Sequence, residues 1–248
     1  MSKNENPNTT RQRSVLVVVA HPDDEVLGCG GTAASFAKLG IPVRVCILAA
    51  DATARRNRPE VSQLHHDIEE SRKVLGLMPY FLGGFANIKL NSIPHLDLVR
   101  FIEQSIDESG ANVIFTHHPN DLNNDHLHTS LACQAAARLF QRRQGTPTLR
   151  ALYFMEILSS TDWAFDSFTL PFMPNTFFGI HDTLDLKIDA LMKYKGVMRP
   201  YPHSRSPETI RALATLRGSQ SGKFFAEAFQ CVFNDLSFDL PENVRHTI

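Results

Sequence analysis

The sequence predicts an α/β protein with a Rossmann-like, doubly wound and mostly parallel sheet, helices on both faces and a C-terminal extension of helices and a strand. Short, uncharged and largely β-branched runs recur along the chain, and such runs are typical of strands buried on both faces. Segments with helical periodicity separate them. This alternation favours parallel strands that are joined by right-handed crossovers.

The individual elements follow from local signals. The first predicted strand ends before Pro22, because proline cannot donate a hydrogen bond to a neighbouring strand. Gly40 and Gly76 end the first two helices, and the segment 93–109 carries its apolar residues along one stripe. The predicted strands are 15–19, 43–49, 80–82, 112–116, 151–156 and 224–233, and the predicted helices are 28–39, 60–75, 93–109, a helix after residue 128 to about 143, 182–195 and 207–218.

Length and composition favour one domain and exclude several classes of protein. The chain has 248 residues, 43% of them hydrophobic, which is enough for a single α/β domain that we place at 14–248. Residues 1–13 are polar and predict a disordered lead instead of a signal peptide. A net charge of -1 argues against a nucleic-acid surface, and no apolar run is long enough for a transmembrane segment. Four cysteines without a CxxC pair predict free thiols in the reducing cytoplasm.

A polar cluster directly follows the first strand, where ligands bind in open α/β sheets. It contains His21, Asp23, Asp24 and Glu25. Adjacent carboxylates repel one another unless a cation offsets them, and imidazole with carboxylate suits zinc or another transition metal. Asp23 could instead take a proton from water as a general base. An acidic helix N-terminus is the alternative, and it explains Asp24 and Glu25 but not His21.

A second polar cluster, 116–128, follows the fourth predicted strand. The first and fourth strands are neighbours in the commonest doubly wound sheets, so both clusters should meet at one crevice. One further ligand from here would give three protein ligands and an open position, as in catalytic zinc sites. Spacing alone does not choose among the candidates, which are His117, His118, His126, His128, Asp121 and Asp125.

These motifs carry a specific resemblance. His21-Pro-Asp-Asp-Glu, then Gly28-Cys-Gly-Gly-Thr, and Asp125-His126 after the fourth strand are together similar to the PIG-L/LmbE-like family of zinc-dependent N-deacetylases. Enzymes of that family remove acetyl groups from N-acetylated amino sugars. The resemblance covers about 15–233, and the segment 201–206 resembles the branch found with bacterial surface-sugar biosynthesis.

The resemblance implies roles for individual residues. Asp23 would be the general base, and Asp125 would orient a neighbouring group. Many members carry a histidine where this chain has Asn123, an amide that can donate to an oxyanion but cannot supply a proton. The proton for the leaving amine would then come from Asp23 or from another group, such as His118 or His203. The implied metal ligands are His21, Asp24 and His126, with Zn²⁺ as the cofactor and other divalent transition metals as alternatives.

The substrate implied by the resemblance is an N-acetylated sugar, free or on a nucleotide or lipid carrier. Arg55 and Arg205 are candidates to hold its hydroxyls or a phosphate, or else are solvated surface arginines. We expect the loops 51–59, 85–93 and 159–175 to shape specificity. Trp163 and Phe165 could stack on a sugar ring, but we expect them to pack in the core. Homo-oligomers are common among similar proteins, so self-association stays an open expectation.

Three rival functions remain at this stage. Gly28 to Ala33 matches a dinucleotide-binding pattern, and Asp51 follows at a suitable spacing for an NAD-binding oxidoreductase. Against it, the glycines do not directly follow the strand, and the carboxylates would oppose a pyrophosphate. The other rivals are a zinc amidase that acts on a non-sugar substrate and a non-catalytic, metal-dependent sugar-binding protein.

Overall fold

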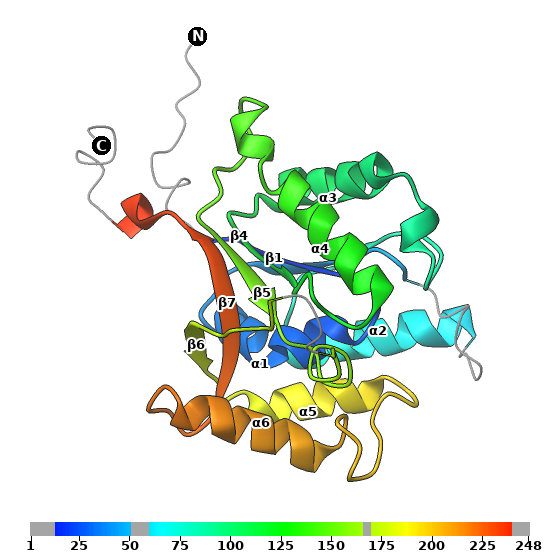
Figure 1. Ribbon diagram of the computed structural model, residues 1–248, viewed down its shortest axis with the longest axis vertical. Helices are drawn as coiled ribbons and strands as arrows, with labels where there is room; N and C mark the ends of the chain where they lie inside the picture. Colours follow the sequence, from blue (N-terminus) through cyan, green and yellow to red (C-terminus); the bar gives the residue numbers. More distant parts are fainter. Residues whose placement is uncertain (1–12, 51–59, 166–169, 240–248) are drawn as a thin grey trace.

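A computed structural model describes residues 13–50, 60–165 and 170–239. Its seven-stranded sheet has the order β3-β2-β1-β4-β5-β7-β6 (Figure 1). The five strands β3, β2, β1, β4 and β5 pair in parallel with their neighbours. Strand β7 pairs antiparallel with both β5 and β6. The strands are β1 (Val15–Val19), β2 (Val43–Ile47), β3 (Phe81–Leu82), β4 (Val113–His117), β5 (Ala151–Met155), β6 (Thr176–Gly179) and β7 (Ala226–Asn234).

Helices cover both faces of this sheet, which confirms the predicted doubly wound α/β architecture. Helices α3 and α4 pack together on one face, and α1, α2, α5 and α6 lie on the other (Figure 1). Each face has its own cluster of buried apolar side chains. The helices are α1 (Asp24–Lys38), α2 (Val61–Leu75), α3 (His95–Ser109), α4 (Asn124–Ala136), α5 (Leu184–Lys193) and α6 (Pro207–Ser219), with 3-10 turns at η1 (Leu90–Ser92), η2 (Leu139–Gln141) and η3 (Leu236–Asp239).

The start of α1 and the strand β6 differ from the sequence prediction. Helix α1 begins at Asp24 and not at residue 28, and it is broken inside at Cys29, which has φ −147° and ψ 22°. The glycine-rich stretch therefore marks a kink in the helix and not its beginning. Strand β6 lies within a stretch that shows no clear strand pattern, and it forms because its backbone extends the sheet next to β7.

The order of the strands brings the two polar clusters together. Strand β1 pairs in parallel with β4, with Val18 opposite Thr116. Parallel neighbours end at the same edge of a sheet, so the segments after β1 and β4 meet there. Helix α4 begins at Asn124, earlier than the predicted start after residue 128, and this places His126 in its first turn.

The described residues also bear on the thiols and on membrane insertion. All four cysteines are free, and Cys29, Cys46 and Cys133 are buried. Among the helices of the described residues, none has the length and apolar character needed to cross a membrane. The predicted lead at residues 1–13 lies outside the described residues except for Arg13.

Candidate metal centre

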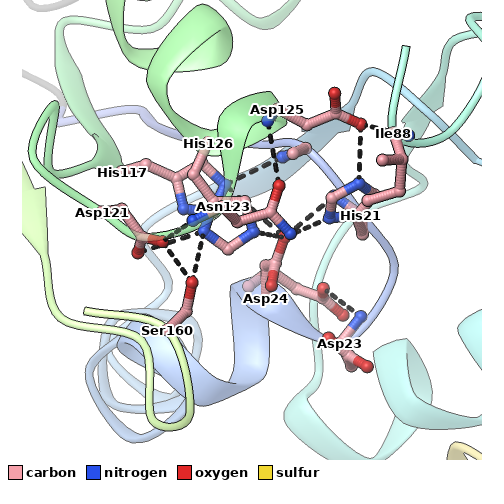
Figure 2. A network of polar contacts seen from close by, with 12 residues as sticks. His21, Asp23, Asp24, Ile88, His117, Asp121, Asn123, Asp125, His126 and Ser160 are labelled. Atoms are coloured by element: carbon pink, nitrogen blue, oxygen red, sulfur yellow. Dashed lines mark hydrogen bonds and ion pairs between the residues drawn. The ribbon is translucent and has the colours of Figure 1, made fainter. Parts of the chain in front are cut away.

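The carboxylate of Asp24 is the centre of a buried polar cluster at the carboxyl edge of the sheet (Figure 2). Its Oδ2 lies 3.4 Å from Nδ1 of His21 and 3.2 Å from Nε2 of His126. The backbone N–H of His21 donates to the same oxygen at 2.9 Å. Ligand atoms of these three residues all lie within 4.8 Å of one another. The structure therefore brings together the three predicted metal ligands, two from the β1–α1 junction and one from α4.

Asp125 holds the far side of the His21 ring. Its Oδ2 lies 3.0 Å from Nε2 of His21, so Nδ1 of that ring is left facing Asp24. Asp125 also accepts the backbone N–H groups of Ile88 at 2.6 Å and of Leu90 at 3.0 Å. A carboxylate that fixes the second nitrogen of a ligating histidine is typical of metal sites. The contacts of Asp125 place it on the far side of the His21 ring from Asp24.

Asp121 does the same for His126. Its Oδ2 lies 3.1 Å from Nδ1 of His126, which leaves Nε2 facing Asp24. Hydroxyl groups of Ser160 and Thr161 donate to Asp121 and hold it in place. Sequence analysis left Asp121 among six candidate ligands, because only the fold shows which side of His126 it occupies.

The electrostatics of this cluster favour a cation. Burial alone would raise the pKa of Asp24, but the imidazoles of His126 and His21 outweigh it and hold that pKa well below its usual value. Burial would lower the pKa of His126, but Asp24 and Asp121 raise it to about 10. A buried carboxylate that attracts protons to its neighbours offers the same attraction to a divalent ion. The donor set therefore fits a metal.

His117 lies next to this cluster but is poorly suited to bind a metal. His117, Asp121 and His126 also have ligand atoms within 4.8 Å of one another. However, Nε2 of His117 accepts the backbone N–H of Ala20 at 2.9 Å, so its lone pair is already used. Burial lowers the pKa of His117 to about 3, which keeps the ring neutral. We therefore assign His117 to the support of the strand end.

The other two candidate histidines lie apart from the ligand atoms. Nδ1 of His118 accepts the backbone N–H of Asn120 at 3.1 Å, and its ring packs edge-on against Phe154 and Phe172. His128 is partly buried on α4 and belongs to neither group of metal-ligating residues found among the described residues.

Asp23 has an unusual backbone conformation for a residue with a side chain. Its φ is 98°, in the left-handed region, although the side chain is buried. The backbone N–H of Asp23 donates to Oε2 of Glu25 at 3.1 Å, and its own Oδ2 lies 3.3 Å from Nη1 of Arg205. Strain of this kind persists only where the surroundings fix it, and it is often found at functional sites.

A cavity of about 400 Å³ opens beside the cluster. His21, Asp23, Asp24 and His126 line it, together with residues from the loops 87–88, 159–160 and 196–205. Two of the three loops expected to shape specificity, 85–93 and 159–175, thus contribute to its wall. The third, 51–59, lies outside the described residues. In 196–205 the sequence indicated only His203 and Arg205 as candidates, and it gave no signal for Gly196, Val197 and Arg199, which also line the cavity.

Asn123 lines the cavity and also caps α4. Its Oδ1 accepts the backbone N–H of Asp125 at 2.9 Å. Because the amide oxygen is used for the cap, the –NH₂ group is the part of Asn123 that can donate to a ligand. This geometry is compatible with the predicted role as an oxyanion donor.

The predicted substrate-contacting residues have mixed outcomes. Arg205 lies at the cavity, whereas Arg55 is outside the described residues. The expectation that Trp163 and Phe165 pack in the core is wrong, because they are 45% and 83% exposed. The ring centroids of Trp163 and His203 lie 5.6 Å apart in an edge-on arrangement.

The glycine-rich break in α1 is occupied by an internal carboxylate. Glu227 on β7 accepts the backbone N–H groups of Gly31 at 3.0 Å and Thr32 at 2.7 Å. Lys187 pairs with Glu227 at 2.6 Å and also donates to the carbonyl of Leu27 at 2.8 Å. The N–H groups that a pyrophosphate would need are therefore satisfied within the protein. This argues against the NAD-binding rival.

Comparison with known proteins shows which family and which relatives this chain is similar to. The family model described as PIG-L, GlcNAc-PI de-N-acetylase, matches residues 16–137, which include both polar clusters. Residues 16–137 of the chain are therefore similar to the PIG-L family. One relative is the uncharacterized deacetylase YaiS of Escherichia coli (strain K12), which is 24% identical over 195 residues, 76% of this chain and 94% of that protein.

Solved structures show that this chain shares its fold with proteins of different activities. The N,N'-diacetylchitobiose deacetylase of Pyrococcus horikoshii has a TM-score of 0.71 at 17% identity, over 92% of this chain and 87% of that one. GalB, the 4-carboxy-2-hydroxymuconate hydratase of Pseudomonas putida KT2440, has a TM-score of 0.68 at 20% identity, over 90% of this chain and 98% of that one. The fold alone therefore does not specify the reaction.

Proposed function

We propose that this protein is a metal-dependent N-deacetylase that removes the acetyl group from an N-acetylated amino sugar, either free or attached to a nucleotide or lipid carrier. The observation that carries the proposal is the meeting of His21, Asp24 and His126 beside Asp23 in one cavity. The match of residues 16–137 to the PIG-L family model supports it. The free state of all four cysteines supports a cytoplasmic location.

Zinc is the metal that we propose for this site. Two imidazoles and one carboxylate would leave a coordination position open, as in catalytic zinc sites, and other divalent transition metals accept the same ligands. When bound, such an ion would polarise the acetamide carbonyl and lower the pKa of water. Asp125 and Asp121 would keep the ligand nitrogens of His21 and His126 turned toward it.

Asp23 is the residue that we propose as general base. It lines the cavity next to Asp24, and its Oδ2 lies 3.3 Å from Nη1 of Arg205, which holds the carboxylate in place. Asp23 would take the proton of the attacking water as the new C–O bond forms. The –NH₂ group of Asn123 would donate to the oxyanion that develops on the former carbonyl oxygen.

The departing amine requires a proton, and Asp23 is best placed to return it. His118 does not line the cavity. His203 does, but its Nδ1 is already used as the acceptor of the backbone N–H of Arg205 at 3.0 Å. We therefore propose that one carboxyl group takes the proton from water and delivers it to the sugar nitrogen as the C–N bond breaks.

A substrate panel tests this proposal. Zinc-loaded protein is incubated with N-acetylglucosamine, its methyl glycoside, its 1-phosphate and its nucleotide conjugate, and acetate and free amine are followed by mass. Stoichiometric release of both from at least one sugar is expected. Cleavage of non-sugar amides alone would favour the amidase, and sugar binding without acetate release would favour the non-catalytic binding protein.

A further inference from the structure

The wall of the cavity contains backbone conformations that residues with side chains rarely adopt. Among the residues that the structure describes, three other than glycine have a left-handed backbone: Asp23 with φ 98°, Ile88 with φ 58° and Ser159 with φ 67°. All three line the cavity. Such a conformation is unfavourable and persists only where the surroundings fix it. The contacts that hold these residues therefore help to determine the shape of the site.

The backbone of Asp23 is held through Glu25 by the residue that ends α5. Oε2 of Glu25 accepts the backbone N–H of Asp23 at 3.1 Å, and its Oε1 accepts the hydroxyl of Tyr194 at 2.5 Å. Both side chains are buried, because Glu25 is 1% exposed and Tyr194 is 3% exposed. A buried hydrogen bond is costly to lose, since water does not replace the missing partner. Glu25 thus links the end of α5 to the proposed general base.

Tyr194 is itself anchored at its place in the fold. It is the C-cap residue of α5, and its backbone N–H donates to the carbonyl of Leu191 at 3.1 Å. The next residue, Lys195, donates its backbone N–H to Oδ2 of Asp67 on α2 at 3.1 Å. Gln63 donates to the other carboxylate oxygen of Asp67 at 2.7 Å. Helices α2 and α5 together therefore fix the position from which the hydroxyl of Tyr194 reaches Glu25.

The carboxylate of Asp23 is held from the other end of the α5–α6 loop, residues 194–206. Nη1 of Arg205 lies 3.3 Å from Oδ2 of Asp23, and Nε of Arg205 donates to the hydroxyl of Ser159 at 2.7 Å. Arg205 therefore joins two of the three left-handed residues. The two ends of one loop thus hold Asp23 in two ways, its backbone through Glu25 and its carboxylate directly.

We infer that Tyr194 is a positioning residue for the reaction, and that its hydroxyl acts through Glu25 to fix the left-handed backbone of Asp23. The inference rests on the proposed deacetylase function and deepens it by adding a residue from outside both polar clusters. Tyr194 is not among the described residues that line the cavity. It therefore acts on the direction of the Asp23 carboxylate and not on the substrate.

Loss of this hydroxyl should affect the chemical step more than substrate binding. A general base must lie within hydrogen-bond distance of the water from which it takes a proton. Misplacement of a reacting group by about 1 Å can lower a rate by roughly 10²-fold. The other residues that line the cavity keep their contacts, so KM should stay near its native value while kcat falls.

Tyr194→Phe tests the inference, because it removes the hydroxyl and keeps the buried ring. In the full-length, zinc-loaded protein, kcat for an N-acetylated sugar should fall by roughly tenfold or more. KM, and the metal content measured by elemental analysis, should stay native. A native kcat in Tyr194→Phe would overturn the inference, and a lower Tm with native kcat would assign the hydroxyl to the stability of the fold alone.

Tyr80→Phe is the matched control. It also removes a tyrosine hydroxyl, but this one is buried without a hydrogen-bond partner among the residues that the structure describes. The substitution should leave kcat unchanged. An equal fall in kcat for Tyr80→Phe and Tyr194→Phe would contradict a specific role of the Tyr194 hydroxyl.

Two substitutions of Glu25 test the link between Tyr194 and Asp23. Glu25→Gln can restore both contacts, because the amide oxygen accepts the N–H of Asp23 and the –NH₂ group donates to the hydroxyl oxygen of Tyr194. It should retain a nearly native kcat. Glu25→Met removes both contacts and should lower kcat at least as much as Tyr194→Phe does. Tyr194→Phe should then have no further effect in the Glu25→Met background. Equal kcat in Glu25→Gln and Glu25→Met would overturn the inference.

Crystal structures of the variants provide a readout that does not need turnover. In Tyr194→Phe the carboxylate of Asp23 should be displaced or take two orientations, whereas Tyr80→Phe should leave it in place. An Asp23 with its native φ and its native contact to Arg205 in Tyr194→Phe would contradict the inference. If no N-acetylated sugar releases acetate, the proposed function fails, and these structures still decide whether Tyr194 positions Asp23.

Discussion

Asp23 combines three features that surface carboxylates lack. It is 1% exposed, it has a left-handed backbone, and an arginine lies against its carboxylate. Glu25 fixes the backbone of Asp23 and in turn accepts the hydroxyl of Tyr194 at 2.5 Å. The last residue of the His-Pro-Asp-Asp-Glu motif therefore supports the conformation of the third. This gives a physical reason for the whole motif, of which only part faces the proposed metal.

Replacement of Asp23 tests whether this residue acts as the general base or as a metal ligand. Asp23→Asn should lower kcat by roughly 10²-fold to 10⁴-fold, because a positioned general base contributes about that much. Metal content, measured by elemental analysis, should stay near one ion per chain. Asp24→Asn is the control and should lose the metal. Loss of metal in Asp23→Asn would make Asp23 a ligand instead.

His118 gives a prediction on the pH dependence of stability. Burial holds the pKa of His118 below its usual value of 6.5, so the unfolded chain takes up the proton first. Its contribution to stability is therefore complete above pH 6.5 and is lost as the pH falls below that value. The free energy of unfolding, from urea titrations, should fall less between pH 7 and 5 in His118→Asn. Parallel curves for both proteins would contradict this.

At the scale of elements, the two helix starts carry the site in different ways. Helix α1 supplies Asp24 from its first turn and is interrupted at Cys29, where Glu227 takes over as an internal cap. Helix α4 supplies His126 from its first turn and is capped by Asn123. Both devices fix the position of a ligand relative to the sheet edge.

Two substitutions can separate the role of Asn123 as the N-cap of α4 from its proposed role as a hydrogen-bond donor to the oxyanion. Asn123→Ser retains a good N-cap, so the free energy of unfolding should change by only a few tenths of a kcal/mol, whereas Asn123→Ala should lose about 1 kcal/mol. Both variants lack the amide donor, and kcat should fall by roughly 10²-fold to 10³-fold in each. An Asn123→Ser enzyme with native kcat would exclude the amide from the reaction.

Breaking the buried ion pair between Lys187 and Glu227 should lower the free energy of unfolding substantially. Lys187→Met leaves the carboxylate of Glu227 buried without its cation, and the free energy of unfolding should fall by about 3 kcal/mol or more. Urea denaturation measures it. Arg211→Gln breaks an exposed pair and should cost less than about 1 kcal/mol. Similar losses in the two variants would show that the internal cap is not important for stability.

At the scale of the whole molecule, the site is assembled from distant parts of the chain. Strands β1 and β4 bring the two ligand-bearing segments together, and the loop before α6 closes the cavity with Arg205. Strand β7 reaches back to α1 through Glu227, which is 196 residues from Gly31. A metal that joins β1, α1 and α4 would therefore stabilise the domain as a unit.

Metal addition and removal test that coupling. Zinc at about 100 times its Kd should raise the free energy of unfolding by about 2.7 kcal/mol, because it binds only the folded chain. Thermal unfolding should show a higher Tm with zinc and a lower Tm after chelation. His126→Gln should remove the response. A zinc effect of the same size in this variant would place the ion elsewhere.

Sequence alone predicted most of the fold and the first half of the site. Buried strands carry continuous apolar runs, and helices carry periodic ones, so local composition is enough to place them. His21, Asp23 and Asp24 are adjacent in sequence, and their chemistry could be inferred from that adjacency. The family resemblance selected His126, which spacing alone had left among six candidates.

Tertiary structure decided what depends on distance between remote residues. It placed Asp125 behind His21 and Asp121 behind His126, where each can orient a ring. It also placed Glu227 on the glycine-rich break of α1, which no local pattern indicates. The strand order determines which side chains meet, and hydrogen-bond partners far apart in the chain leave no mark in sequence spacing. The residue types that could bind a metal are therefore predictable from the sequence, whereas the orientation of their side chains depends on the folded sheet.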